Sequence, residues 1–193
     1  MLRAGVWLKP AVFLASAAPA VASVVMLLTG RLGINPIERL TDDTGEWALR
    51  FLILSLAATP LRHLLSRTWP LKLRRMLGLF AFFYAAVHVL IWSVLDQQID
   101  LAAMWDDLIE RPYIFAGFVA FAIMVPLAAT STTKIARRMK QSWNSLHRLV
   151  YVAAAAAIVH YVWLVKGDRL EPFVYLAALA LLYLYRFKRL LST

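Results

Sequence analysis

The sequence predicts an all-α integral membrane protein: a bundle of six membrane-spanning helices with both termini in the cytoplasm. Three observations lead to this fold class. Of the 193 residues, 62% are hydrophobic and the mean hydropathy is +0.67, whereas soluble domains are closer to half apolar. The apolar residues form six runs, each near the roughly 20 residues that cross a hydrocarbon layer. Basic and acidic residues also alternate between successive connections, as in multi-pass proteins.

The six predicted spans make up one domain, residues 1–193. Pro19, Pro60 and Pro126 lie within spans, where membrane helices tolerate proline. No span contains a carboxylate, so the Asp/Glu relays typical of pumps and transporters are missing. We expect the helices at residues 10–29, 47–65, 73–95, 113–130, 144–165 and 173–185.

The charges orient the predicted bundle. Fifteen of the 21 basic residues lie at the termini or around the second and fourth connections, which the positive-inside rule assigns to the cytoplasm. All 11 acidic residues fall on the opposite side. The net charge of +10 therefore reflects membrane topology rather than nucleic-acid binding. The acidic outer face either suits a partner with a basic docking patch or is an ordinary solvated surface.

The buried polar chemistry left in the predicted spans is mostly that of histidine, and an ionisable side chain inside a membrane helix is a functional candidate by default. His88 lies in the third span, and His147 and His160 lie in the fifth. The chain has no cysteine, which excludes disulfides, covalently attached haem and cysteine-ligated iron–sulfur clusters.

His88 and His160 are predicted to lie at nearly the same membrane depth. His88 is 15 residues past the start of its span and His160 is 16 past the start of its own, and both spans run outward. Two imidazoles at one depth across a bundle are what a six-coordinate, low-spin haem b requires. The alternative is a pair of histidines that only pack between helices.

His147 lies 13 residues before His160, about 20 Å deeper toward the cytoplasm. Arg75 occupies the matching level of the third span, so a second bis-histidine site lacks its fourth ligand. His147 is either a third haem ligand, part of a site for an anionic flavin, quinone or haem propionate, or an interfacial anchor. The other candidate residues of this cofactor site are Arg74, Arg75, Trp143 and Arg148.

Polar residues near the outer ends of the spans have simpler accounts. Arg50 follows Glu46 by four positions, which favours a local ion pair; Arg50 and Arg111 are also candidates to meet a haem propionate. Asp43 or Thr44 is expected to cap the second span.

Six stretches in this order resemble a known family. They are GINPIERLTDDTGEWAL at 33–49, TPLR at 59–62, RRMLGLFAFFYAAVH at 74–88, RPYI at 111–114, PLAATS at 126–131 and WNSLHRLVYVAAAAAIVHYVWLVK at 143–166. Together they cover nearly the whole chain and resemble the MsrQ (YedZ) family of haem-binding membrane subunits, which is similar to the ferric reductase and NADPH oxidase transmembrane domain.

This resemblance implies a bacterial inner-membrane subunit with haem b and FMN, in which His88, His147 and His160 carry the haem ligation. It implies electron transfer from the quinone pool or a cytosolic flavin reductase. The acceptor would be a periplasmic molybdopterin-containing reductase that repairs oxidised methionine. The chain would then be the redox subunit of an oxidoreductase complex, not its sulfoxide-reducing subunit.

Two other functions remain open from the residues. The protein is alternatively a self-contained cytochrome b-type reductase that oxidises quinol or reduces ferric chelates at its own surface. A non-redox transporter or membrane scaffold, whose histidines only pack, is the third possibility.

Overall fold

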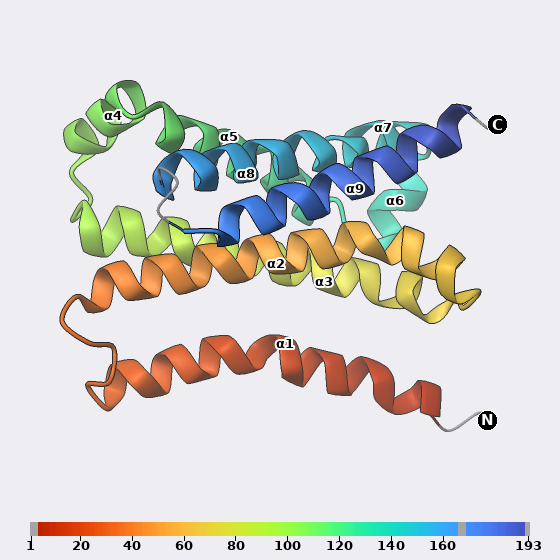
Figure 1. The fold of residues 1–193 in the computed structure, drawn as a ribbon, viewed down its shortest axis with the longest axis horizontal. Helices are drawn as coiled ribbons and strands as arrows, with labels where there is room; N and C mark the ends of the chain where they lie inside the picture. Colours follow the sequence, from red (N-terminus) through yellow and green to blue (C-terminus); the bar gives the residue numbers. More distant parts are fainter. Residues whose placement is uncertain (1–3, 166–168, 192–193) are drawn as a thin grey trace. The chain divides into compact units, whose positions relative to one another are not determined.

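The computed structural model describes residues 4–165 and 169–191, and helices joined by short connections make up this part of the chain (Figure 1). It divides into two compact units, Met1–Asp100 and Leu101–Thr193. Arg3, Lys166 and Asp168, which enter the predicted charge partition, lie outside the described residues. The elements of the first unit are α1 (Ala4–Leu28), α2 (Pro36–Leu65), α3 (Trp69–Leu90) and a π-helical segment, η1 (Ile91–Asp96). Those of the second are α4 (Leu101–Glu110), α5 (Pro112–Ala129), α6 (Thr133–Met139), α7 (Gln141–Arg148), α8 (Val150–Val165) and α9 (Glu171–Leu191).

Five helical stretches in the described part of the chain are long and apolar enough to cross a membrane. They are Trp7–Leu28, Pro36–Leu65, Trp69–Asp96, Pro112–Ala129 and Gln141–Val165. The sixth predicted span falls within α9, whose apolar stretch between Glu171 and Arg186 is shorter than the roughly 20 residues of a typical span. The structure thus supports a multi-pass helical membrane protein, and the sixth span and the cytoplasmic termini stay predictions.

Helix α2 begins at Pro36, well before the predicted start at residue 47. Asn35 is its N-cap, because its side chain accepts a hydrogen bond from the amide of Glu38 at 3.3 Å, and proline at the first helical position suits a helix start. The prediction that Asp43 or Thr44 caps this helix is therefore wrong. The polar residues that suggested a loop instead form the first turns of a long helix.

In the first unit, α2 packs mainly along α3, and α1 is attached to this pair by Tyr84. The Tyr84 hydroxyl donates to the carbonyl of Ser16 at 2.8 Å and accepts from the amide of Ala20 at 3.0 Å. These two groups are i→i−4 partners in a regular helix, so the hydroxyl bridges one turn of α1 next to Pro19. Residues buried between the helices include Leu49, Phe51, Leu52, Leu56, Ala58, Leu73, Ala81 and Tyr84.

In the second unit, α5 packs mainly against α8. Ala153 and Ala154 of α8 are fully buried, and such small residues let membrane helices approach closely. Helix α9 packs on α8, where the Tyr183 hydroxyl donates to the carbonyl of Tyr151. The residues that α5 buries are Ala120, Met124 and Leu127.

Candidate functional site

His88 lies in the last turn of α3 and is half-buried against α2. Its Nδ1 is 2.9 Å from the carbonyl oxygen of Thr41. One turn further along α2, Gly45 lies directly against the ring, because a Cβ built there would be 3.1 Å from both Nδ1 and Cε1 of His88. The imidazole is therefore held against the backbone of α2 by one hydrogen bond and one close contact.

His160 lies in α8 and is half-buried against α5. Its Nδ1 is 2.6 Å from the carbonyl oxygen of Tyr113. Gly117, one turn further along α5, lies against the ring, because a Cβ built there would be 2.9 Å from Nδ1 and 3.1 Å from Cε1 of His160. The second unit thus has the same local arrangement as the first.

The two histidine sites share one geometry, which we call the histidine seat. In each seat the histidine follows the residue that offers its carbonyl by 47 positions, and the glycine follows that residue by four. A carbonyl oxygen only accepts hydrogen bonds, so Nδ1 carries the proton and Nε2 carries the lone pair. A neutral imidazole with this tautomer is the form that ligates iron through Nε2, and metal-ligating histidines typically donate their other N–H in this way.

His147 has a different environment, at the junction of α7 and α8. Its Nε2 is 3.0 Å from the Thr130 hydroxyl, and its ring stacks on Trp143 with the centroids 3.9 Å apart. The Trp143 indole N–H donates to the carbonyl of Thr130 at 2.9 Å. The predicted pair of His147 and Trp143 is therefore brought together, and Thr130 joins them.

The three predicted arginines lie near the ends of helices. Arg74 and Arg75 lie in the first turns of α3, where Arg74 is half-buried and its carbonyl accepts a hydrogen bond from Ser55 at 3.0 Å. Arg75 is exposed, and so is Arg148 at the end of α7. That all of them share one cofactor site with Trp143 stays a prediction.

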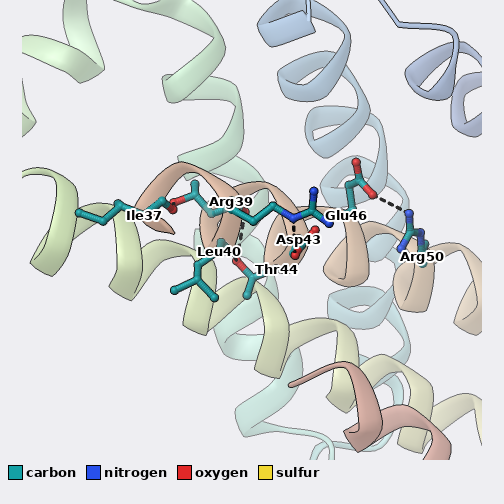
Figure 2. A network of polar contacts seen from close by, with 8 residues as sticks. Ile37, Arg39, Leu40, Asp43, Thr44, Glu46 and Arg50 are labelled. Atoms are coloured by element: carbon teal, nitrogen blue, oxygen red, sulfur yellow. Dashed lines mark hydrogen bonds and ion pairs between the residues drawn. The ribbon is translucent and has the colours of Figure 1, made fainter. Parts of the chain in front are cut away.

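The N-terminal half of α2 has several local polar contacts (Figure 2). Arg39 pairs with Asp43 at 3.0 Å, and Arg50 pairs with Glu46 at 2.5 Å. The guanidinium of Arg50 also lies over the Trp47 ring, 4.7 Å from its centroid. The predicted local ion pair of Arg50 is confirmed. The second unit has a similar i,i+4 pair, Arg111 with Asp107 at 3.2 Å.

Sequence reasoning missed the residues that hold the candidate ligands: the carbonyls of Thr41 and Tyr113, the two seat glycines and Thr130. The glycines left a signal, since an isolated glycine in a helical stretch usually has a packing or functional reason. The equal spacing of 43 residues from each glycine to its histidine was a second signal. Backbone carbonyls leave none, because every residue has one.

Comparisons with known proteins identify relatives of this chain. The family described as ferric reductase like transmembrane component matches residues 44–158. A protein-methionine-sulfoxide reductase heme-binding subunit MsrQ from Rhodospirillum rubrum is 48% identical over 89% of this chain and 83% of its own length. Proteins of the same name from Ralstonia nicotianae and Herminiimonas arsenicoxydans are 46% and 44% identical, over 89% and 93% of this chain and 81% and 84% of their own lengths. No solved structure matches the chain.

Proposed function

The chain belongs to the MsrQ family of ferric reductase-like membrane proteins, and from this premise we propose that it is the haem-binding electron-transfer subunit of a methionine sulfoxide reductase system. It holds haem b within the membrane and passes electrons to a partner reductase. The partner, rather than this chain, reduces the sulfoxide. The observation that carries the proposal is the pair of histidine seats.

The seats fit axial haem ligation chemically. His88 and His160 each keep Nδ1 on a backbone carbonyl, so each has its Nε2 lone pair in the tautomer that iron requires. A haem with two such ligands is a one-electron carrier whose potential depends on the hydrogen bonds of its ligands and on burial. Their predicted equal depth supports His88 and His160 as the two axial ligands of one haem.

A second site near the cytoplasmic surface receives electrons in this proposal. It includes a group of residues linked by hydrogen bonds and ring stacking: His147, Trp143 and Thr130. The basic side chains of Arg74, Arg75 and Arg148 suit the phosphate of FMN, a haem propionate or a quinone head group. The donor is the quinol pool or a cytosolic flavin reductase.

On the outer side, we propose that a periplasmic molybdopterin-containing reductase docks on the acidic face. The names of the relatives describe them as subunits of a reductase, which supports a separate partner. The proposed topology has both termini in the cytoplasm, α9 as the sixth span and the bacterial inner membrane as the location.

A self-contained cytochrome b-type reductase is the second candidate function. The match of residues 44–158 to the ferric reductase like transmembrane component favours it. In that case the purified protein alone would reduce ferric chelates or oxidise quinol with turnover. In the subunit proposal, turnover requires the partner and its sulfoxide substrate.

The visible spectrum of the purified protein tests the haem proposal. We expect a Soret band and the sharp α-band of a low-spin haem b after expression with added haem. His88→Ala and His160→Ala should each abolish the low-spin signal, because each removes one axial ligand. His63→Ala is the matched control, since His63 is an exposed histidine at the end of α2. A spectrum without a Soret band, or a low-spin haem retained in both ligand variants, would refute the proposal.

A further inference from the structure

Two glycines lie against the two candidate ligands, one in each unit. In the described chain, the positive-φ glycines are Gly30 and Gly33, so Gly45 and Gly117 have ordinary helical backbone. Their conformation does not call for glycine. What calls for glycine is the closeness of the imidazoles, with a Cβ at Gly117 only 2.9 Å from His160 Nδ1.

We propose that Gly45 and Gly117 are positioning residues for the axial haem ligands, an inference that rests on the proposed function. Each glycine lets an imidazole lie against a helix backbone while Nδ1 bonds the carbonyl one turn earlier. This contact, together with the hydrogen bond, limits rotation of the ring about its Cβ–Cγ bond. The neighbouring helix, α2 for His88 and α5 for His160, thereby sets the orientation of the imidazole ring that would offer Nε2 to the iron.

The consequences for the iron follow from the hydrogen bond at Nδ1. A histidine that donates its second N–H is a more basic ligand, and a more basic ligand stabilises the oxidised iron. A methyl group at either glycine pushes the ring away from the carbonyl and weakens this bond. The reduction potential should therefore rise, and the rotation of the ring plane should change the electron paramagnetic resonance spectrum of the oxidised haem.

The distances predict an order of effects. A Cβ at Gly117 would lie 2.9 Å from the His160 ring, closer than real Cβ contacts come, so the ring or the helix has to shift. At Gly45 the closest distance to the His88 ring is 3.1 Å, which a movement of a few tenths of an ångström relieves. Gly117→Ala should therefore disturb the haem more than Gly45→Ala does.

A third glycine provides the control. Gly78 lies in α3, and a Cβ there would be 3.3 Å from the Ser55 hydroxyl rather than from a histidine. All three glycine-to-alanine changes are made inside membrane-spanning helices, where alanine is the better helix former. A change in haem content, spectrum or midpoint potential that occurs in Gly45→Ala and Gly117→Ala but not in Gly78→Ala therefore comes from the imidazole contact.

The experiment measures haem per chain, the resonance spectrum and the midpoint potential of the purified variants. Gly117→Ala should weaken haem retention at least about tenfold, as changes to groups that orient metal ligands do. Gly45→Ala should keep its haem with a raised potential and an altered spectrum, and Gly78→Ala should match the parent. Parental spectra and potentials in both seat variants would overturn the inference.

A double-mutant cycle covers the case in which Gly117→Ala is too unstable to bind haem. The added methyl should lower the melting temperature when His160 is present but not in a His160→Ala background, because removing the ring makes room. Equal losses in both backgrounds would mean that Gly117 only packs helices, which overturns the inference. A parent that lacks haem altogether would instead refute the proposed function, whatever the cycle shows.

Discussion

The Nε2 atom of His147 lies 3.0 Å from the hydroxyl oxygen of Thr130. That hydroxyl has one hydrogen, which it donates to the carbonyl of Pro126 at 2.6 Å, so toward His147 it accepts. The proton of a neutral His147 is therefore on Nε2, the nitrogen that carries the lone pair in both histidine seats. His147 presents the opposite tautomer from His88 and His160, which favours a role at the proposed electron-receiving site over one as a third haem ligand.

Replacing His147 with alanine should keep the haem and slow its reduction. The low-spin spectrum is expected to stay, because both proposed axial ligands remain. Reduction by a soluble quinol, followed in a stopped-flow instrument at the Soret band, should slow at least about tenfold if His147 orients the donor. Loss of the low-spin signal in this variant would instead make His147 a haem ligand.

Thr130→Val tests the same contact from its other side. This change keeps the volume of the side chain but removes the hydroxyl that accepts the hydrogen bond from His147. Reduction of the haem should therefore slow, but by less than in His147→Ala. Thr29→Val, which removes an exposed hydroxyl at the end of α1, is the control and should reduce at the parental rate.

Arg50→Gln should leave the midpoint potential of the haem unchanged. Arg50 is paired with Glu46 at 2.5 Å and lies over Trp47, and an i,i+4 pair of this kind contributes less than about 0.5 kcal/mol to stability. Potentiometric titration distinguishes this local role from contact with a propionate. A cation next to the haem disfavours the oxidised iron, so a clear fall in potential would indicate propionate contact. Arg39→Gln, which breaks the comparable pair with Asp43, is the control.

Tyr84→Phe should loosen α1 from the rest of its unit. The Tyr84 side chain is 1% exposed, and its hydroxyl links α3 to Ser16 and Ala20 of α1. Losing a buried interhelical hydrogen bond of this kind costs about 1 kcal/mol, or about 2–4 °C in melting temperature for a chain of this size. Thermal unfolding in detergent measures the loss, with Tyr185→Phe in α9 as the control. An unchanged melting temperature would mean that apolar packing alone holds α1.

The membrane helices were predictable because their signal is local. An apolar run has to become a helix in hydrocarbon, where backbone groups find no water, and α1, α3, α5 and α8 accordingly lie near their predicted positions. The start of α2 was missed because its first turns are polar. The charged side chains between Asn35 and Arg50 pair along the helix rather than forming a loop, and a local excess of polar residues does not distinguish these two outcomes.

The sequence by itself determined that this is a helical membrane protein, that it belongs to a haem-binding family and that His88, His147 and His160 are its candidate functional histidines. Only the tertiary structure decided which nitrogen each histidine offers. That choice depends on which oxygen lies within reach of the ring, and those oxygens belong to Thr41, Tyr113 and Thr130 on other helices. The tertiary structure likewise explains why glycine suits positions 45 and 117, because a Cβ there would lie against an imidazole that is more than 40 residues away in the chain.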